Sequence, residues 1–289
     1  MIPPLNQCSV KRMPSGMNRL RKWLPFALPG LAGFCVIYIA PFFETTYYSF
    51  LSDIFSKVFV WFENYGKVLK NEYFRLAIRN TGVFLVAGCM SVMLVSVVVS
   101  YCLMMFLRNS SLIKGIMLVP FLIPSAAVVS AWTKVFDPIY FSYKIPDEGI
   151  GVFLAQVPIL AIFIWKNCGL MIIIINTAMQ RVPDNVIEAS KLDGAGAVKR
   201  LTKIILPTIR PNLLFALVLT MAESLKIYKD CYLYYKTDYP PEGAYFLQNY
   251  MNNHFAKLDY EILTTATVIF VAVAGIAVAI LYRKDREYN

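Results

Sequence analysis

The sequence predicts an all-α, polytopic membrane protein with six transmembrane helices. Of its 289 residues, 58% are hydrophobic and 16% are charged, whereas a soluble domain averages about 45–50% apolar and about 25% charged residues. The mean hydropathy is +0.55, so the surface must be apolar as well as the core. This composition excludes a soluble globular enzyme and a disordered chain.

Six apolar stretches are long enough to cross a bilayer, whose hydrocarbon core of about 30 Å needs roughly 20 helical residues. These stretches must be helices, because a lone strand in lipid would leave its backbone polar groups unsatisfied. A basic tail, residues 1–22, precedes the first stretch. The predicted spans cover residues 23–50, 81–107, 113–135, 150–179, 212–235 and 262–282.

The charges within the spans distinguish them from one another. The first, second, third and sixth spans have uncharged cores. The first follows basic residues, as a signal peptide would, but it is too long and lacks a small-residue cleavage site. The fourth span contains a single charged residue, Lys166. The fifth span is apolar at its start and contains four charged residues further along. Those four are Glu223, Lys226, Lys229 and Asp230.

The distribution of positive charge predicts that both termini lie in the cytoplasm. Sixteen of the 28 Lys and Arg residues fall on the side of the N-terminus, nine on the opposite side and three within the spans. Cytoplasmic loops carry such an excess in membrane proteins. The charges flank apolar runs and form no continuous basic face, so the net charge of +10 does not indicate nucleic-acid binding.

The sequence offers little material for a metal site or for catalysis. It contains one histidine, His254, and six cysteines without a C-x-x-C pair. A His-based metal site and a Ser-His-Asp triad are therefore disfavoured, and so is a membrane-embedded enzyme. No role is assigned to His254.

The connection between the fourth and fifth spans, residues 180–211, is predicted to form two short helices around a tight turn. Pro183 suits the first position of a helix. Gly194 permits a left-handed backbone at the turn. Pro207 is expected to end the second helix, and Pro211 to open the fifth span. Two interpretations remain open: a docking site for a soluble protein, or an amphipathic hairpin on the membrane surface.

The loop contains Glu188-Ala189-Ser190, then Asp193-Gly194-Ala195, then Ile204-Ile205-Leu206-Pro207 and Pro211. In this order the residues resemble the EAA signature of ABC importer permeases. The signature reads E-A-A-x-x-D-G-A, a spacer, I-x-L-P and a following proline. Ser190 replaces its second alanine, a small-for-small change. The residues that carry the resemblance are Glu188, Ala189, Ser190, Asp193, Gly194, Ala195, Ile204, Leu206, Pro207 and Pro211.

Further motifs, in the right order along most of the chain, resemble the carbohydrate-uptake branch of that family, the maltose, lactose and glycerol-phosphate type. They include Leu28-Pro29, Glu63-Asn64-Tyr65, Asn80-Thr81, Trp165 and Gly169. The resemblance implies a type I ABC importer permease fold in a bacterial cytoplasmic (inner) membrane. It also implies that a helix of the loop couples the chain to an ATPase. The implied coupling residues are Glu188, Ala189, Ser190, Asp193, Gly194, Ala195, Leu206 and Pro207.

The resemblance implies several partners as well. An extracytoplasmic solute-binding protein would deliver a sugar and face the segment 236–261. A paralogous second permease subunit would complete the path through the lipid, and two ATPase subunits would supply the energy. The sequence contains no G-x-x-x-x-G-K-[ST] motif. ATP and Mg²⁺ are therefore expected in the partner ATPase, with no cofactor in this chain.

Charges within a membrane are expensive, at about 2.5–3.5 kcal/mol each near its centre, and suggest function by default. At 100° per residue, Glu223, Lys226 and Asp230 share one face of the fifth span, while Lys229 is expected to point elsewhere. Two interpretations remain open. The charges could form structural salt bridges, or they could line the substrate path. The candidate path residues are Lys166, Asn167, Glu223, Lys226, Tyr228 and Asp230.

The main functional hypothesis is an ATP-driven importer permease for an oligosaccharide or glycoside. One alternative is an ion-coupled secondary transporter that uses an intramembrane carboxylate such as Glu223. Another is an ABC permease for a phosphorylated polyol such as glycerol phosphate. Dependence of transport on a separate ATPase would distinguish the first alternative from the main hypothesis.

Overall fold

The computed structural model describes residues 16–53, 56–106, 111–140 and 153–286. Within these ranges the regular structure is helical, apart from one isolated β-bridge between Leu51 and Phe59. This confirms the predicted all-α class. Most of the basic tail and small parts of the second and fourth predicted spans lie outside the described residues.

Four continuous helical stretches are long and apolar enough to cross a membrane. The first runs from Pro25 to Tyr48 through α1 (Gly16–Phe34), a short π-helix (Cys35–Ile39) and α2 (Ala40–Tyr48). The other three are α4 (Glu72–Phe106), α8 (Val157–Met179) and α15 (Tyr260–Arg286). They correspond to the first, second, fourth and sixth predicted spans, with α4 beginning nine residues before the predicted start at residue 81.

The third predicted span, 113–135, is not one straight helix. It consists of α5 (Ser111–Leu122) and α6 (Ser125–Tyr140), which meet at a bend of 90°. Pro124 lies at the bend. Its ring fixes the backbone and removes an N–H donor, and it disfavours helical geometry at the preceding Ile123. The sequence predicted one span here, whereas the structure has a sharp corner between two helices.

The fifth predicted span, 212–235, is also broken. It consists of α12 (Arg210–Ser224) and α13 (Tyr228–Tyr235), separated by a turn at residues 225–227. At this turn a hydrogen bond between residues i and i+3 replaces the α-helical i to i+4 bond. The amide of Lys226 donates to the carbonyl of Glu223. Before α12 the chain bends by 82°. Up to six crossings result if each bent pair crosses once.

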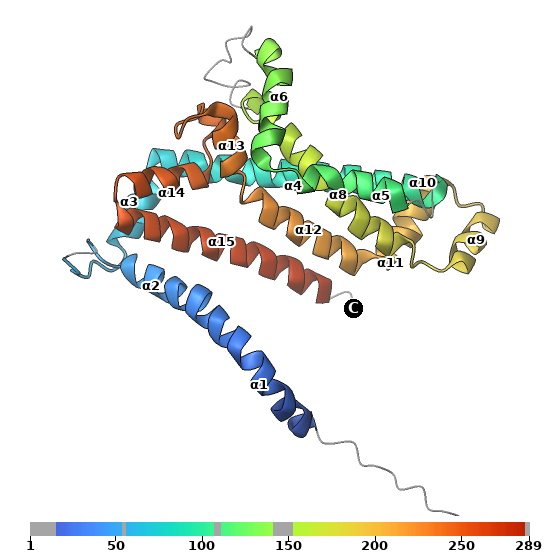
Figure 1. The fold of residues 1–289 in the computed structure, drawn as a ribbon, viewed down its shortest axis with the longest axis horizontal. Helices are drawn as coiled ribbons and strands as arrows, with labels where there is room; N and C mark the ends of the chain where they lie inside the picture. Colours follow the sequence, from blue (N-terminus) through green and yellow to red (C-terminus); the bar gives the residue numbers. More distant parts are fainter. Residues whose placement is uncertain (1–15, 54–55, 107–110, 141–152, 287–289) are drawn as a thin grey trace, which may run out of the picture.

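The core is built around α8, which packs against α4, α5, α12, α6 and α13. Figure 1 shows α4, α5, α8, α12 and α15 along the long axis of the molecule, with α6 rising across them. Ile159, Phe163 and Ile175 of α8 are at most 1% exposed. Gly169 lies so close to α5 that a Cβ there would overlap the carbonyl oxygen of Met117. The helices pack tightly because this position has no side chain.

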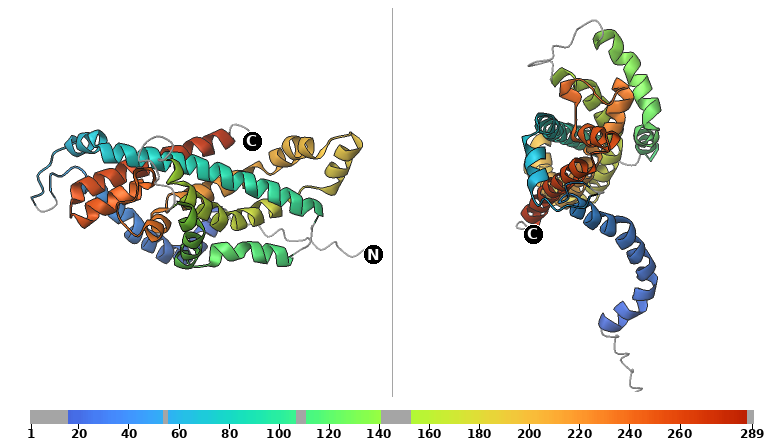
Figure 2. Two further views of the ribbon diagram at one scale, coloured as in Figure 1. Left: turned by 90° about the horizontal axis from the view of Figure 1, so that it is seen from above. Right: turned by 90° about the vertical axis from the view of Figure 1, so that its left-hand side faces the viewer.

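The first helical stretch projects away from this core. Figure 1 and the right-hand view of Figure 2 show α1 leaving the body, while α2 packs against α15. Its hydrophobic window is 0% buried within the chain. Phe26, Val36 and Ile37 are each at least 66% exposed. Lipid or another subunit must cover this surface in a membrane.

The end of the molecule opposite α9 is closed by α3 (Glu63–Lys70) and by the segment 236–259, which contains α14 (Leu247–Ala256) (Figure 1). The side-chain amide of Asn80 donates to the carbonyls of Glu242 (2.6 Å) and Tyr245 (3.1 Å). These bonds fasten the segment to the start of α4. His254, for which the sequence showed no partner, lies 3.2 Å from the Asp259 carboxylate through Nδ1.

Candidate functional site

The loop between α8 and α12 contains the helix–turn–helix that the sequence predicted. Its first helix is α9 (Asp184–Leu192), and its second is α10 (Ala197–Arg200). Gly194 has a left-handed backbone, with φ of +71°. Its amide donates to the carbonyl of Lys191 (3.1 Å), and the amide of Ala195 donates to the carbonyl of Ser190 (2.9 Å). These bonds satisfy carbonyls at the end of α9 and fix the turn.

The residues implied for coupling divide into an exposed group and a packed group. Glu188, Ala189, Asp193 and Gly194 are exposed on α9 and its turn. Ser190 is buried, and its hydroxyl donates to the carbonyl of Ile187 at 2.6 Å. A small side chain is needed here because this face of α9 packs inward.

The aliphatic end of the loop packs against the helical core. Ile205 is 0% exposed and belongs to the same apolar cluster as the buried face of α8, and Leu206 packs against that cluster. Pro207 is exposed and lies within α11 (Leu206–Thr208), directly after a π-helix (Leu201–Ile205). The helical stretch Ala197–Thr208 ends one residue after Pro207, so the prediction that Pro207 ends the second helix is correct to within one residue. The bend follows at Ile209, whose backbone leaves helical geometry.

Arg200 connects the two halves of the loop, and sequence reasoning did not identify it. Its side chain is buried, and Nη2 donates to the carbonyl of Ala195 at 3.1 Å. Beside it, the hydroxyl of Tyr101 on α4 donates to the carbonyl of Ala197 at 3.1 Å. The hairpin is thereby fixed both internally and to α4. No spacing or motif in the sequence distinguishes Arg200 from its exposed neighbour Lys199.

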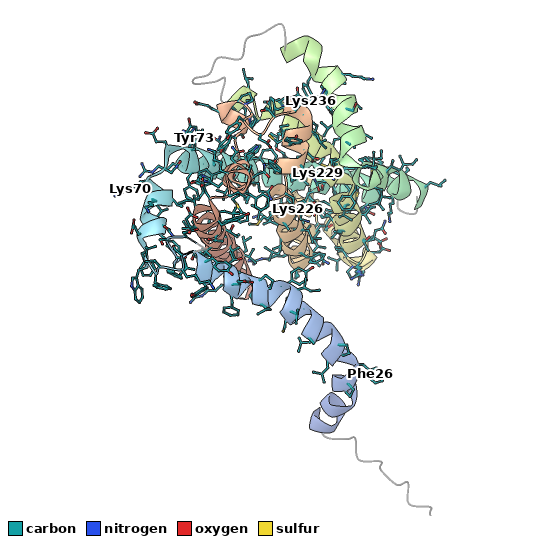
Figure 3. The ribbon with its side chains drawn as sticks, turned by 60° about the vertical axis from the view of Figure 1, so that its left-hand side comes forward. Phe26, Lys70, Tyr73, Lys226, Lys229 and Lys236 are labelled. Carbon is teal, nitrogen blue, oxygen red and sulfur yellow. The ribbon has the colours of Figure 1, made fainter. Side chains whose placement is uncertain are left out.

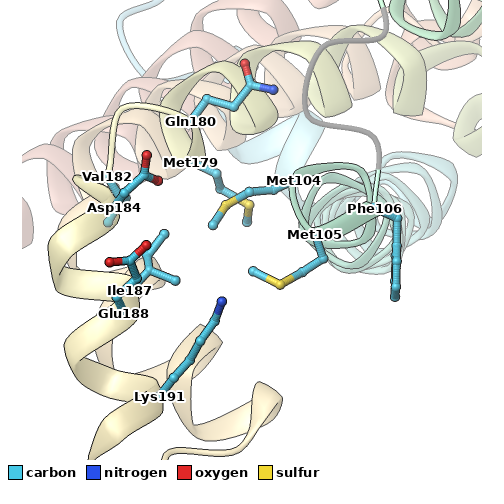
Figure 4. A pocket seen from close by; sticks show the side chains of 10 residues that line it. All are labelled: Met104, Met105, Phe106, Met179, Gln180, Val182, Asp184, Ile187, Glu188 and Lys191. Carbon is cyan, nitrogen blue, oxygen red and sulfur yellow. The ribbon is translucent and has the colours of Figure 1, made fainter.

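A cavity of about 290 Å³ separates α9 from the end of α4 (Figure 4). Glu188 and Lys191 of α9 face Met105 across it. Phe106 beside it is 82% exposed, and Leu192 at the end of α9 is 89% exposed. Flexible methionines and exposed apolar side chains are typical of surfaces that bind other proteins.

A second group of functional candidates surrounds a cavity of about 240 Å³, here named the charged pocket. It lies where the breaks in the third and fifth predicted spans meet α8. The pocket is lined by Phe121, Ile123, Ser125, Phe163, Lys166, Asn167, Glu223, Lys226, Lys229 and Asp230. Five of the six candidate path residues are therefore brought together.

Within the charged pocket, Lys166 of α8 and Asp230 of α13 form an ion pair. Their Nζ and Oδ2 atoms lie 2.8 Å apart, and the side chains are only 16% and 9% exposed. Lys166 also donates to the hydroxyl of Ser125 at 2.8 Å. One pair of the predicted salt bridges between the fourth and fifth spans is thus present, and it joins α8, α6 and α13.

The structure corrects the predicted orientation of Lys229. On a continuous helix it would point away from the other charges, but α13 is a separate helix and Lys229 lines the charged pocket. Figure 3 shows Lys226 and Lys229 near each other at this break. Tyr228 is not among the lining residues. Its hydroxyl lies 3.0 Å from the carboxylate of Asp238.

Residues 93–284 match the sequence profile of a family described as "Binding-protein-dependent transport system inner membrane component". The chain is 28% identical over 218 residues to the sn-glycerol-3-phosphate transport system permease protein UgpA of Yersinia pestis bv. Antiqua (strain Antiqua), covering 69% of this chain and 72% of the relative. The protein of the same name from Escherichia coli O6:K15:H31 is 29% identical over 216 residues, with the same coverage.

Two solved structures share the fold. One is a bacterial ABC transporter involved in the import of the acidic polysaccharide alginate, matched with a TM-score of 0.75 and 18% identity over 94% of this chain and 98% of that chain. The other is the bacterial alginate ABC transporter in complex with an alginate pentasaccharide-bound periplasmic protein, with a TM-score of 0.75, 18% identity and coverages of 94% and 97%. These matches confirm the predicted type I importer permease fold.

Proposed function

The chain belongs to the family of binding-protein-dependent transport system inner membrane components, and on that premise we propose that it forms half of the translocation path of an ATP-driven carbohydrate importer. It is accordingly a multi-pass inner-membrane transport protein and not an enzyme. Membership of this family argues against the alternative hypothesis of an ion-coupled secondary transporter. The observation that carries the proposal is the hydrogen-bonded hairpin between α8 and α12, which exposes Glu188 and Asp193.

The hairpin acts as the coupling element in this proposal. Glu188, Asp193 and Gly194 form the docking surface for an ATPase subunit, and Ile205 and Leu206 hold the loop against the core. A hairpin fixed by Arg200 and by the Gly194 turn moves as one body, so a displacement of the ATPase reaches α12 without being absorbed by the loop. ATP and Mg²⁺ bind to the ATPase subunits.

We propose six crossings, with both termini in the cytoplasm. In this arrangement the third and fifth crossings are the broken ones. The loop 180–211 and the end of α15 lie toward one end of the molecule, and α3 and α14 lie toward the other (Figure 1). The first end then faces the cytoplasm and the ATPases, in agreement with the distribution of Lys and Arg. The opposite end faces the solute-binding protein.

A paralogous permease subunit forms the other half of the path. The exposed apolar surface of α1 and α2 supports this part of the proposal, since 0% of its hydrophobic window is buried within the chain. The charged pocket lies at the broken helices and provides this subunit's polar contribution to the path. Lys166 and Asp230 hold its walls, while Asn167, Glu223 and Lys226 contact the substrate.

The substrate is an oligosaccharide or glycoside in this proposal, and a phosphorylated polyol is the second candidate. The similarity to permeases named for sn-glycerol-3-phosphate supports the second candidate. The fold shared with a transporter of alginate supports the first.

The test is to purify the complex through a tag on this chain and to place it in proteoliposomes. We expect co-purification of an ATPase and a second permease. Saccharide uptake should require ATP, fail with a non-hydrolysable analogue and survive a protonophore. Uptake that is independent of ATP and abolished by the protonophore would contradict the proposal.

A further inference from the structure

The charged pocket contains three lysines and only two carboxylates. Lys166 is fully engaged, because its ammonium donates to Ser125 at 2.8 Å and to both oxygens of Asp230, at 2.8 and 3.1 Å. An ammonium has three N–H donors. Lys166 and Asp230 therefore neutralise each other and have no donor left for a ligand.

The second ion pair is of a different kind. Lys226 lies 2.8 Å from Glu223, but its side chain is 66% exposed and that of Glu223 is 34% exposed. Exposed pairs of this type contribute little stability and exchange partners readily. A ligand that enters the pocket can therefore compete for Lys226 without disrupting the fold.

Lys229 supplies the excess positive charge. It is exposed, and within the described part of the chain no hydrogen bond or ion pair engages its ammonium. Lys236, which caps α13, follows seven residues later. Figure 3 shows Lys226, Lys229 and Lys236 along this part of the molecule. A row of like charges that leads to a pocket attracts ligands of opposite charge.

We propose that the charged pocket binds an anionic saccharide, whose carboxylate or phosphate group pairs with Lys229 and Lys226. One anionic group neutralises the one excess positive charge of the lining. The amide nitrogen of Asn167 donates to the carbonyl of Phe163 at 2.9 Å. The side-chain oxygen of Asn167 accepts a hydrogen bond from a hydroxyl of the sugar. Glu223 accepts a hydrogen bond from a second hydroxyl, and Phe121 and Ile123 contact the sugar ring. This proposal rests on the function proposed above and specifies the substrate class.

The direct test is protection of Lys229 from an amine-acetylating reagent, measured by mass spectrometry on the assembled complex. The probes are digalacturonate, glucose 6-phosphate and maltose. We expect both anionic probes to slow the modification of Lys229 several-fold, and maltose to leave it unchanged. Protection by only one anionic probe would identify the group, carboxylate or phosphate, that the pocket accepts. The exposed Lys134 of α6, outside the pocket, is the internal control.

Variants provide the second measurement. Lys229→Gln should raise the half-saturating concentration of the anionic probe about tenfold, because one charge-assisted contact is lost. Lys229→Arg should retain binding, and Lys134→Gln should not change it. Equal protection by maltose, or no protection by any probe, would overturn the anionic-substrate proposal even if an ATPase co-purifies and drives uptake. Absence of the ATPase would instead overturn the importer proposal, and the protection data would still test whether the pocket binds an anionic saccharide.

Discussion

The ammonium of Lys166 lies 2.8 Å from the carboxylate of Asp230, in a contact between α8 and α13 that is almost closed to solvent. It joins α8, the most buried of the four long helices, to the helix that follows the break in the fifth predicted span. The pair therefore fixes the position of α13, and with it the direction of Lys229. The Lys166–Asp230 pair is buried, as a structural role requires, whereas the other charges line the charged pocket, where a role in the substrate path stays a prediction.

Replacing one member of this pair should destabilise the protein strongly. Lys166→Met or Asp230→Leu leaves an uncompensated buried charge, at a cost of about 3–5 kcal/mol, whereas the double variant should be nearly neutral. Thermal unfolding of the detergent-purified protein measures the difference. The control is Lys226→Met in the exposed pair, which should cost less than about 1 kcal/mol. Equal losses for the single and double variants would contradict a structural role for the pair.

Gly169→Ala should disrupt the contact between α8 and α5. A methyl group there would overlap the backbone oxygen of Met117, and backbone cannot move aside as a flexible side chain can. Overpacking of this kind costs about 1–3 kcal/mol or more. The matched control is Gly82→Ala in α4, where no atom lies within 4 Å of the added group. Comparable melting temperatures for the two variants would show that the helices can separate at this point.

Gly194→Ala should weaken coupling without a steric clash. No atom lies within 4 Å of an added Cβ, but the residue has φ of +71°, and a side chain in this conformation costs about 1–2 kcal/mol. The turn should shift, and the ATPase retained after washing should fall several-fold. Gly194→Asn should be milder, because asparagine tolerates this backbone. Gly196→Ala is the control, since Gly196 has φ of −62°. The account is contradicted if Ala at 194 and Ala at 196 behave alike.

Arg200→Met should loosen the hairpin. It removes the hydrogen bond to Ala195, and a bond to a charged group is worth about 1.5–3 kcal/mol. Amide hydrogen exchange at residues 195–200 should accelerate roughly tenfold or more, because local opening becomes easier. Lys199→Met, at an exposed neighbour, should not change exchange. Unchanged protection in Arg200→Met would show that α4 alone holds the loop.

The sequence was sufficient to predict the long apolar helices and the hairpin. The apolar stretches that form α4, α8 and α15 are long enough to cross a bilayer, and in lipid such stretches must be helical. The hairpin was predictable because Gly194 marks a backbone conformation that few other residues adopt. These features depend on local composition and local stereochemistry.

The charged pocket could be predicted only in part. The charges were visible in the sequence, but the turn at residues 225–227 contains neither Gly nor Pro. Tertiary packing sets this break, and the orientation predicted for Lys229 was therefore wrong. Pro124 was visible, yet the size of the bend depends on how α6 packs against α8 and α13. The contact of Arg200 with Ala195 arises from a turn and could not be inferred from spacing.

The central claim is that the hairpin between α8 and α12 docks on a separate ATPase. The most direct measurement places a photo-cross-linking amino acid at Leu192, which is 89% exposed at the end of α9, and in parallel at Leu258, which is 65% exposed near the start of α15. Illumination of the intact complex should attach the ATPase subunit at position 192 and not at position 258. Attachment at position 258, or none at position 192 in a complex that still transports with ATP, would contradict the account.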